Sequence, residues 1–352
     1  MPDDTAPPSS PPAKRRGVLR RHPVLVALVM LLVLVVGGGV GASMYLTTTL
    51  DGIDRFELFT LPENRRPQPT GGSSGDAVNI LLAGVDKGDG RSIAEIQDGG
   101  WDAGGLRTDT IMVLHVTADR ERAYLISVPR DSYVRLYDAT GRPQGMDKIN
   151  AAFSLFGPTA YLSTVENLTG LRMDHLAVVD WAGFEDITNA LGGVEVSVAG
   201  GGARQLDGDE ALAYVRTRYG LPGGDFDRID RQQNFLRSML GTVLSGDTLA
   251  NPFTLNSTLR AVVGNLTVDD AFDTDEMREL ALSLRSLRTG DITFLTAPFG
   301  DFGTTAAGAS IVRLDEAQAD TLWEATANDE IAGYLDEYGA ESEQLPQPGQ
   351  VN

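Results

Sequence analysis

The sequence predicts an α/β fold in which a mixed β-sheet is sandwiched between helices, preceded by one transmembrane helix. Short apolar, β-branched runs alternate with helical patterns along one continuous stretch, which is typical of a sheet covered by helices. A run of uncharged residues near the N-terminus is long enough to cross a bilayer. Of the 352 residues, 42% are hydrophobic, so the chain can bury a sizeable core.

The N-terminal part predicts a membrane anchor. Residues 1–23 are rich in Pro and Ser and then basic, so we expect a disordered cytoplasmic segment. Residues 24–46 carry no charge and, at about 1.5 Å per residue, would cross a hydrocarbon core of roughly 30 Å as one helix. The basic flank keeps the N-terminus in the cytoplasm and sends the rest of the chain outside. A cleaved signal peptide is the alternative, because small residues occupy positions 40–43.

The rest of the chain predicts a linker at 47–75, an extracytoplasmic catalytic domain at 76–328 and a flexible acidic tail at 329–352. Strands are predicted at 78–85, 110–116, 123–128, 176–179, 194–198 and 291–297. Helices are predicted at 149–157, 159–169, 181–191, 226–245, 274–287 and 314–328. Strands and helices thus alternate within one domain.

Composition excludes several classes of site. Cysteine is absent and there are only three histidines, so thiolate metal sites, Ser-His-Asp triads and His-rich metal sites are not expected. Any metal would be a hard cation bound through carboxylates. The net charge is −20 although residues 1–23 are basic, so the body of the chain is strongly acidic and nucleic acid is not an expected partner.

Arginine is concentrated in residues 213–236. Arg216 and Arg218 are two residues apart, and in an extended backbone both side chains leave the same face and can contact one ligand. Arginine suits a phosphate because its planar guanidinium can hold two oxygens and stays protonated. The pair therefore predicts a phosphate-sized target, and salt bridges to the neighbouring aspartates are the alternative.

A helix is predicted to begin just after this pair. Asp225 or Asp227 can serve as its N-cap, and its first turns then contain Arg228, Arg231 and Gln232. Free backbone N–H groups and the helix dipole favour an anion at such a position. We therefore expect arginines from both sides of the intervening turn to converge on one anion.

Two acidic residues adjoin predicted strands. Asp86 follows the strand at 78–85, and Asp109 precedes the strand at 110–116. Neighbouring strands would bring both carboxylates to one edge of the sheet, where they could hold Mg²⁺ together with phosphate oxygens and water. The alternative is that both residues cap turns.

Further charged residues lie at the ends of predicted elements. Arg130 and Asp131 follow the strand at 123–128, where α/β sheets commonly contact ligands, and a surface ion pair is the alternative. Lys148 could neutralise a phosphate, or it could be solvated at a helix start. Carboxylates that can hold a cation, together with arginines, are typical of phosphoryl-transfer sites, where catalysis relies on positioning and charge neutralisation. No Gly-x-x-x-x-Gly-Lys-Ser/Thr loop is present, so an NTPase is not expected.

Several ordered motifs resemble those of the LytR-CpsA-Psr family. The motifs are NILLAGVD at 79–86, RTDT at 107–110, VPRDS at 128–132, KINAAF at 148–153, LGGV at 191–194, YVRTR at 214–218 and DFDRIDRQQ at 225–233. They cover residues 76–245 well and the C-terminal third only loosely. A membrane anchor, a linker and an outer domain are also typical of this family.

The resemblance implies a membrane-anchored phosphotransferase of cell-wall biogenesis. Such enzymes move a glycopolymer from a polyprenyl-pyrophosphate carrier to a peptidoglycan sugar hydroxyl through a phosphodiester bond. The cofactor would be Mg²⁺, with Mn²⁺ as an alternative. The polymer stays open between teichoic acid, arabinogalactan and capsule. A pyrophosphate hydrolase and a non-catalytic module that binds polyprenyl phosphate are the rival functions.

The resemblance also assigns site residues. Asp86 and Asp109 match the metal-associated acids. The residues expected to bind the pyrophosphate are Arg107, Arg130, Lys148, Arg216, Arg218, Arg228, Arg231 and Gln232. The residues expected to be catalytic are Arg107, Arg130, Asp131, Arg216, Arg218 and Asp225. The general base stays open between Asp86, Asp131 and Asp225, and helices at 149–191 would line a channel for the polyprenyl tail or simply pack in the core.

Two features depart from the family pattern. The segment between Asp86 and Arg107 is long and rich in Gly, so the placement of Asp86 relative to Asp109 is open. Asp227 stands where a small residue is common, and it would either add an acid to the pocket or cap the helix.

Overall fold

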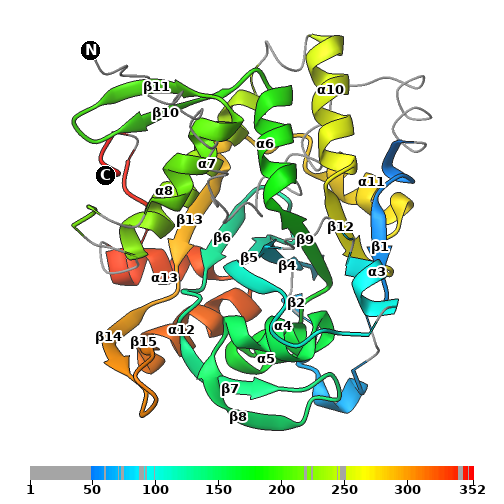
Figure 1. Cartoon of the computed structure of the whole chain (residues 1–352), viewed down its shortest axis with the longest axis vertical. Helices are drawn as coiled ribbons and strands as arrows, with labels where there is room; N and C mark the ends of the chain where they lie inside the picture. Colours follow the sequence, from blue (N-terminus) through cyan, green and yellow to red (C-terminus); the bar gives the residue numbers. More distant parts are fainter. Residues whose placement is uncertain are drawn as a thin grey trace, which may run out of the picture.

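A seven-stranded mixed sheet forms the centre of the molecule (Figure 1). The computed structural model describes residues 49–58, 61–69, 71–72, 75–86, 91, 93–98, 100–217, 220–222, 225–243, 245, 251–339, 344–347 and 349–352. The strand order is β1 (Asp54–Phe56), β12 (Leu266–Asp269), β9 (His175–Asp180), β4 (Val78–Asp86), β5 (Arg107–Val116), β6 (Ala123–Ser127) and β13 (Ile292–Thr296). Strands β4, β9, β6 and β13 share one direction, and β5 runs against its neighbours β4 and β6.

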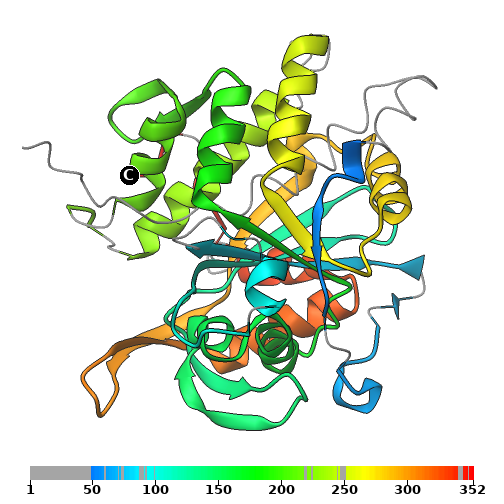
Figure 2. The same cartoon turned by 45° about the vertical axis from the view of Figure 1, so that its right-hand side comes forward.

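Helices cover both faces of this sheet (Figures 1 and 2). One face packs against α6 (Trp181–Ala190), α7 (Gly208–Arg216), α8 (Asp225–Val243), α10 (Pro252–Val263) and α11 (Thr274–Ser283). The other packs against α3 (Ile93–Asp98), α4 (Asn150–Phe156), α5 (Pro158–Thr169), α12 (Glu316–Ala327) and α13 (Ile331–Tyr338). Side chains alternate along β4, so that Leu82 enters the first core and Leu81 the second.

Smaller elements surround the sheet. The antiparallel pairs are β7 (Tyr133–Tyr137) with β8 (Pro143–Lys148), β10 (Val194–Val198) with β11 (Gly202–Leu206), β14 (Phe299–Thr304) with β15 (Ser310–Leu314), and β2 (Gly71–Gly72) with β3 (Gly75–Asp76). The 3₁₀ turns are η2 (Glu63–Arg65) and η3 (Thr289–Asp291). The β14–β15 hairpin projects from the body in Figure 2.

All of the predicted strands and helices are present, with ends that differ by a few residues. The sequence prediction missed α7, α10, β1, β12 and most of the small ribbons. The fold is also wider than the predicted domain. Strand β1 lies in the predicted linker and pairs with β12, while α13 and the buried Val351 lie in the predicted tail.

The predicted cytoplasmic segment and the transmembrane helix at 24–46 lie outside the described residues. Within the part of the chain that the structure describes, no helix combines the length and the apolar character that crossing a membrane requires.

A glycine with positive φ turns the chain between α4 and α5. Gly157 has φ 87° and ψ −177°, a conformation that essentially only glycine adopts. A Cβ built there would stand 3.3 Å from the Trp101 ring, whose Nε1 donates to the Ser154 carbonyl at 3.1 Å. Trp101 therefore ties the segment between β4 and β5 to this corner.

We expect Gly157→Ala to lower the free energy of unfolding by about 1–3 kcal/mol, because alanine is strained in this conformation. Denaturant unfolding of the purified protein measures the change. Gly145→Ala is the matched control, since nothing lies within 4 Å of its would-be Cβ. Equal stability of the two variants would contradict this account of the corner.

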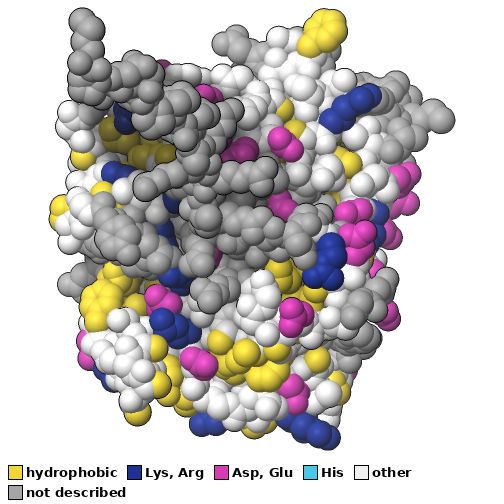
Figure 3. All heavy atoms as spheres, viewed as in Figure 1, with side chains coloured by type: hydrophobic (Ala, Val, Ile, Leu, Met, Phe, Trp, Pro, Cys, Tyr) yellow, Lys and Arg dark blue, Asp and Glu magenta, His cyan; other side chains and the backbone are white. Residues whose placement is uncertain are grey.

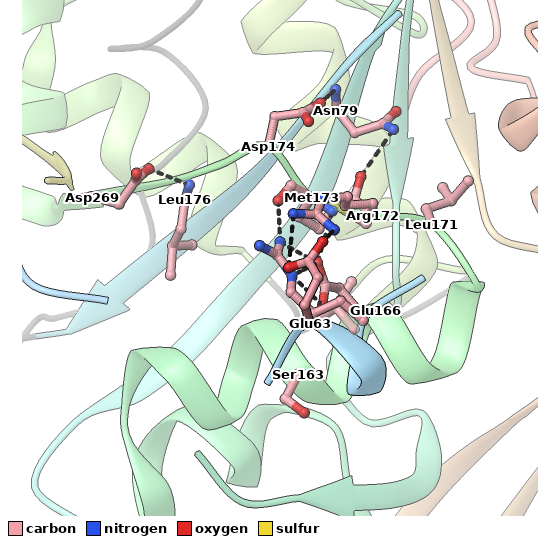
Figure 4. A network of polar contacts seen from close by, with 12 residues as sticks. Glu63, Asn79, Ser163, Glu166, Leu171, Arg172, Met173, Asp174, Leu176 and Asp269 are labelled. Atoms are coloured by element: carbon pink, nitrogen blue, oxygen red, sulfur yellow. Dashed lines mark hydrogen bonds and ion pairs between the residues drawn. The ribbon is translucent and has the colours of Figure 1, made fainter. Parts of the chain in front are cut away.

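A buried polar network closes the sheet edge at which β4 and β9 begin (Figure 4). Arg66 donates to the fully buried Glu166 carboxylate at 2.6 Å, and the same carboxylate accepts the Met173 backbone N–H at 3.0 Å. The Asn79 backbone N–H donates to Asp174 at 2.8 Å. The polar groups at this edge are therefore hydrogen-bonded within the fold. Asp86 lies at the opposite end of β4.

His175 extends the same network and predicts a pH dependence. Burial alone would lower the pKa of His175, but the carboxylates of Asp269, Glu276 and Asp174 outweigh burial and raise it. A histidine with a raised folded pKa stabilises the fold fully below its unfolded pKa, near 6.5, and loses that contribution as pH rises through the folded pKa. The free energy of unfolding should therefore fall as the pH rises from about 6.5 through the folded pKa of His175. The fall should be smaller in His175→Gln. Identical pH profiles for the two proteins would contradict the assignment.

Candidate active site

A β-bulge places the predicted acidic residues at one edge of the sheet. Asp86 pairs with Arg107 at the end of β4, Val85 pairs with Thr108, and Gly84 pairs with Thr110. Asp109 is therefore the extra residue of β5 at the bulge. Bulges redirect side chains and are common beside active sites.

The buried carboxylate of Asp109 forms an ion pair with Arg130 Nη1. The Asp109 side chain is 1% exposed and that of Arg130 is 10% exposed. Arg130 Nε also lies 3.9 Å from Asp131 Oδ2, and Lys148 Nζ lies 3.1 Å from Asp131 Oδ1. The structure thus brings four predicted site residues into one chain of alternating charges.

Backbone hydrogen bonds fix the loop that carries Arg130 and Asp131. The Asn150 N–H donates to the Arg130 carbonyl at 3.3 Å, and the Ile149 N–H donates to the Ser132 carbonyl at 2.8 Å. The Ser132 hydroxyl donates to the Pro129 carbonyl at 2.6 Å. The start of α4 therefore holds this loop in place beside β5.

Helix α8 is anchored across the ends of β6 and β13 by Gln233, which is fully buried. Its Nε2 donates to Ser127 Oγ at 2.7 Å, to the Leu295 carbonyl at 2.8 Å and to Thr296 Oγ1 at 3.3 Å. These ends belong to the same sheet edge as the end of β4, because β4, β6 and β13 run in one direction. Gln233 therefore sets the position of the N-terminal turns of α8 over that edge.

Arg228 lies in the first turn of α8 and is 1% exposed, which makes it one of the largest fully buried side chains. It precedes Gln233 by about 7.5 Å along the helix axis. Coulombic attraction strengthens as water is excluded, so a guanidinium in this setting attracts an anion more strongly than a surface arginine does. The sequence identified Arg228 but gave no sign of its burial.

Arg216 corrects the expectation of an extended arginine pair. It is the last residue of helix α7, so the argument from alternating strand side chains does not apply to it. Burial and the charge of Asp209 raise the pKa of Glu185 on α6, while the charge of Arg216 lowers it. Arg218 lies outside the described residues.

Arg231 is engaged at the C-terminus of the chain. Its Nε donates to the Asn352 carbonyl, and its guanidinium carbon lies 4.9 Å from the centroid of the Tyr214 ring. Asp227 accepts from Asn352 Nδ2 at 3.5 Å. These contacts hold Arg231 and Asp227 against the last residue of the chain, and the role of Arg231 in anion binding stays a prediction.

Two further expectations are settled at the level of the backbone. Asp225 is the first residue of α8 and Asp227 the third, so both lie within the helix, not at its N-cap. Gln232 Nε2 lies 3.5 Å from the Val215 carbonyl and connects α8 to the last turn of α7. The side chains of Asp86, Arg107 and Asp225 lie outside the part of the molecule that is described.

The helices predicted to line a channel for the tail lie on both faces of the sheet. Helices α4 and α5 pack on one face of the sheet through residues such as Phe153 and Val165. Helix α6 packs on the other face through Phe184 and Ile187. The three helices therefore do not share one face of the sheet, and these side chains pack in the two cores, which is the alternative to a channel.

An aromatic cluster that the sequence did not suggest adjoins Arg228. Phe226, in the same turn of α8, stacks on Phe299 with ring centroids 3.8 Å apart, and Phe302 meets Phe226 edge-on at 5.4 Å. Phe302 is 65% exposed. The cluster joins the β14–β15 hairpin to the start of α8.

The carboxylates of this edge fit a hard divalent cation in their chemistry. Mg²⁺ is usually held by one or two carboxylates together with water and phosphate oxygens, and the edge offers Asp109 and the end of β4 at Asp86. No group of three or more His, Asp or Glu residues with the spacing of a metal site occurs within the described ranges.

Comparisons with known proteins point to one family. The profile of the LytR_cpsA_psr family matches residues 58–328. The probable cell wall biosynthesis protein LcpB of Corynebacterium glutamicum is 38% identical over 260 residues, which are 70% of this chain and 60% of LcpB. The polyisoprenyl-teichoic acid–peptidoglycan teichoic acid transferase TagU of Enterococcus faecalis is 34% identical over 221 residues, covering 60% of this chain and 67% of TagU.

Solved structures share the fold. Bacillus subtilis TagV superimposes with a TM-score of 0.58 at 24% identity, covering 73% of this chain and 97% of TagV. TagT bound to LIIa-WTA gives a TM-score of 0.54 at 22% identity, covering 77% of this chain and 99% of TagT. The match spans only 60% of the length of LcpB and 56% of that of LcpA, a second Corynebacterium glutamicum relative.

Proposed function

Because this chain belongs to the LytR-CpsA-Psr family, we propose that it is a phosphotransferase of cell-wall biogenesis. It moves a glycopolymer from a polyprenyl-pyrophosphate carrier to peptidoglycan and leaves a phosphodiester bond. The observation that carries this proposal is the buried cationic edge formed by Arg130, which is paired with Asp109, and by Arg228. The TagU relative, named as a peptidoglycan teichoic acid transferase, supports the same reaction class.

The edge suits a diphosphate for an electrostatic reason. Guanidinium groups bind phosphate oxygens through paired, charge-assisted hydrogen bonds that are stronger than neutral ones. Arg228 is buried and Arg130 nearly so, so little water competes with the ligand for them. A bound diphosphate would contact Arg130 while Arg130 keeps its ion pair with Asp109. It would also be attracted by the positive charge of Lys148, which contacts Asp131.

The proposed reaction breaks one phosphorus–oxygen bond and forms another. A peptidoglycan hydroxyl attacks the phosphorus that bears the polymer sugar, and the bond to the bridging oxygen breaks, so polyprenyl phosphate leaves. The arginines neutralise the charge that grows on the leaving phosphate. The hydroxyl proton passes to a carboxylate of this edge, for which Asp86, Asp131 and Asp225 are the candidates.

The metal and the membrane anchor belong to the same proposal. Asp109 and Asp86 would hold Mg²⁺, or Mn²⁺ in its place, which when bound would neutralise further phosphate charge. Residues 24–46 would form the single transmembrane helix, with the N-terminus in the cytoplasm and the catalytic domain outside the cell. Such an anchor would keep the site near the membrane in which the polyprenyl tail of the carrier is dissolved.

Transfer is tested with the full chain in detergent, Mg²⁺ and a lipid-linked polymer, with and without peptidoglycan fragments. The proposal predicts polymer joined to peptidoglycan through a phosphodiester, together with release of polyprenyl phosphate that depends on the acceptor. Equal release without acceptor would identify a hydrolase. Binding of the lipid without any product would identify a non-catalytic module.

A further inference from the structure

A groove of about 770 Å³ runs beside the candidate active site, between the β7–β8 ribbon, the β14–β15 hairpin and the start of α12. Its walls combine two tyrosines with apolar, charged and amide side chains, among them Tyr133, Arg135, Tyr137, Asn167, Arg313 and Asp320. None of these residues belongs to the buried cationic edge of Arg130 and Arg228 described above. In the view shared by Figures 1 and 3, these elements occupy the lower part of the molecule, where acidic, basic and hydrophobic side chains are interspersed.

Strand β7 presents a regular row of side chains to this groove. Tyr133, Arg135 and Tyr137 alternate with Val134 and Leu136, which are buried at 6% and 2% exposure. Alternate strand residues share a face and stand about 7 Å apart. The row therefore offers repeated contacts along one direction, as an extended polymer requires.

The groove begins at the active-site loop. Tyr133 pairs with Lys148, which contacts Asp131 through its ammonium group. On the hairpin side, the Val312 N–H donates to the Asp131 carbonyl at 2.9 Å. A chain lying in the groove would therefore lead directly to the loop that carries Arg130 and Asp131.

The charges of the lining select the kind of ligand. Arg313 is paired with Asp301 at 3.2 Å, and the acids Glu316 and Asp320 outnumber the remaining cation, Arg135. A polymer rich in phosphate would be repelled by this excess of negative charge. A neutral glycan would not be, because its hydroxyls can both donate to carboxylates and accept from Arg135 while its sugar rings pack against tyrosine.

We propose that this groove binds the glycan strand of the acceptor peptidoglycan and presents one of its hydroxyls to the active-site loop. The proposal rests on the transferase function proposed above and adds the surface that recognises the acceptor. It makes Tyr137 a residue that determines specificity for the acceptor and that lies outside the buried cationic edge. Its backbone N–H donates to Thr164 Oγ1 on α5 at 3.0 Å, so the row is held firmly against that helix.

The test compares Tyr137→Ala with Tyr137→Phe and with the control Phe253→Ala. Phe253 is 85% exposed on α10 and does not line the groove. Loss of one well-placed aromatic contact should weaken binding to purified peptidoglycan glycan strands, with their lactyl carboxyl groups capped as amides, by about tenfold. It should also raise the KM for the acceptor without changing kcat. Tyr137→Phe keeps the ring and should stay within about threefold of the parent, and Phe253→Ala should bind as the parent does.

A second measurement separates this proposal from the proposed function. Binding of a short-chain prenyl pyrophosphate should be the same in Tyr137→Ala and in the parent, because Tyr137 lies outside the buried cationic edge. Unchanged glycan binding in Tyr137→Ala would overturn the groove assignment even if transfer occurs. Weaker prenyl-pyrophosphate binding in this variant, or competition of a phosphate-rich polymer for the groove, would overturn it as well. Absence of transfer with groove-dependent glycan binding would instead overturn only the transferase function.

Discussion

Replacing Arg228 by methionine is expected to lower the rate of polymer transfer by about 10²–10³-fold, the usual cost of removing one preorganised charged donor from a transition state. Arg228 is 1% exposed in the first turn of α8, so its charge acts with little competition from water. Methionine keeps a long, flexible side chain that can fill the vacated space. The fold should therefore survive while transfer fails. Steady-state transfer by the purified full-length protein measures the effect.

Arg260→Met is the matched control for Arg228→Met, because Arg260 lies on α10 and its side chain is exposed. We expect it to leave both the transfer rate and the unfolding transition unchanged. If Arg228→Met retained the parent rate with a normal unfolding transition, the buried cationic edge would have no part in the reaction.

Replacing Arg130 by methionine is expected to lower both activity and stability. The substitution removes the guanidinium that the buried Asp109 carboxylate contacts, and breaking a buried ion pair on one side costs about 3–5 kcal/mol. Transfer should fall by about 10³-fold, since an arginine that neutralises a transferring phosphoryl group is worth 10³–10⁵. Denaturant unfolding and the transfer assay measure the two effects separately.

The double variant Arg130→Met with Asp109→Asn separates structure from chemistry. Asparagine removes the buried negative charge, so stability should recover by a large part of the loss. Activity should not recover, because the phosphate would still lack Arg130. Recovery of transfer in the double variant would show that Arg130 serves only to neutralise Asp109.

The core of the fold could be predicted because its strands are apolar runs with clear ends. Strand β4 was predicted from a short apolar, β-branched run, and helix α6 from a helical pattern that ends at Gly192 and Gly193. Strand β1 was missed because three residues, Asp54–Phe56, are too few for a periodic pattern, and only their pairing with β12 makes them a strand. Helix α7 was missed although Asp207 and Glu210 form a capping box, a signal that the sequence carries.

The sequence identified residues of the candidate site, but it indicated fewer of the contacts that these residues make. Asp109, Arg130, Asp131 and Lys148 were all identified, and the structure places them in contact. The contact of Arg231 with Asn352 joins residues far apart in the chain, and no local pattern could indicate it.

Gln233 was overlooked although it shares the buried face of α8 with Leu236 and Leu240, at positions i, i+3 and i+7. A polar residue among core positions of a helix was the available signal. The tyrosines of β7 gave no signal at all, because tyrosine is common in ordinary strands.

The central claim is that Arg130 and Arg228 together bind the diphosphate of a polyprenyl carrier. A crystal structure of the protein with a short-chain prenyl pyrophosphate and Mg²⁺ tests it most directly. We predict phosphate oxygens within hydrogen-bonding distance of both guanidinium groups, with the first prenyl unit leading away from the sheet edge. A diphosphate bound elsewhere, with Arg130 and Arg228 making no contact to it, would contradict the claim.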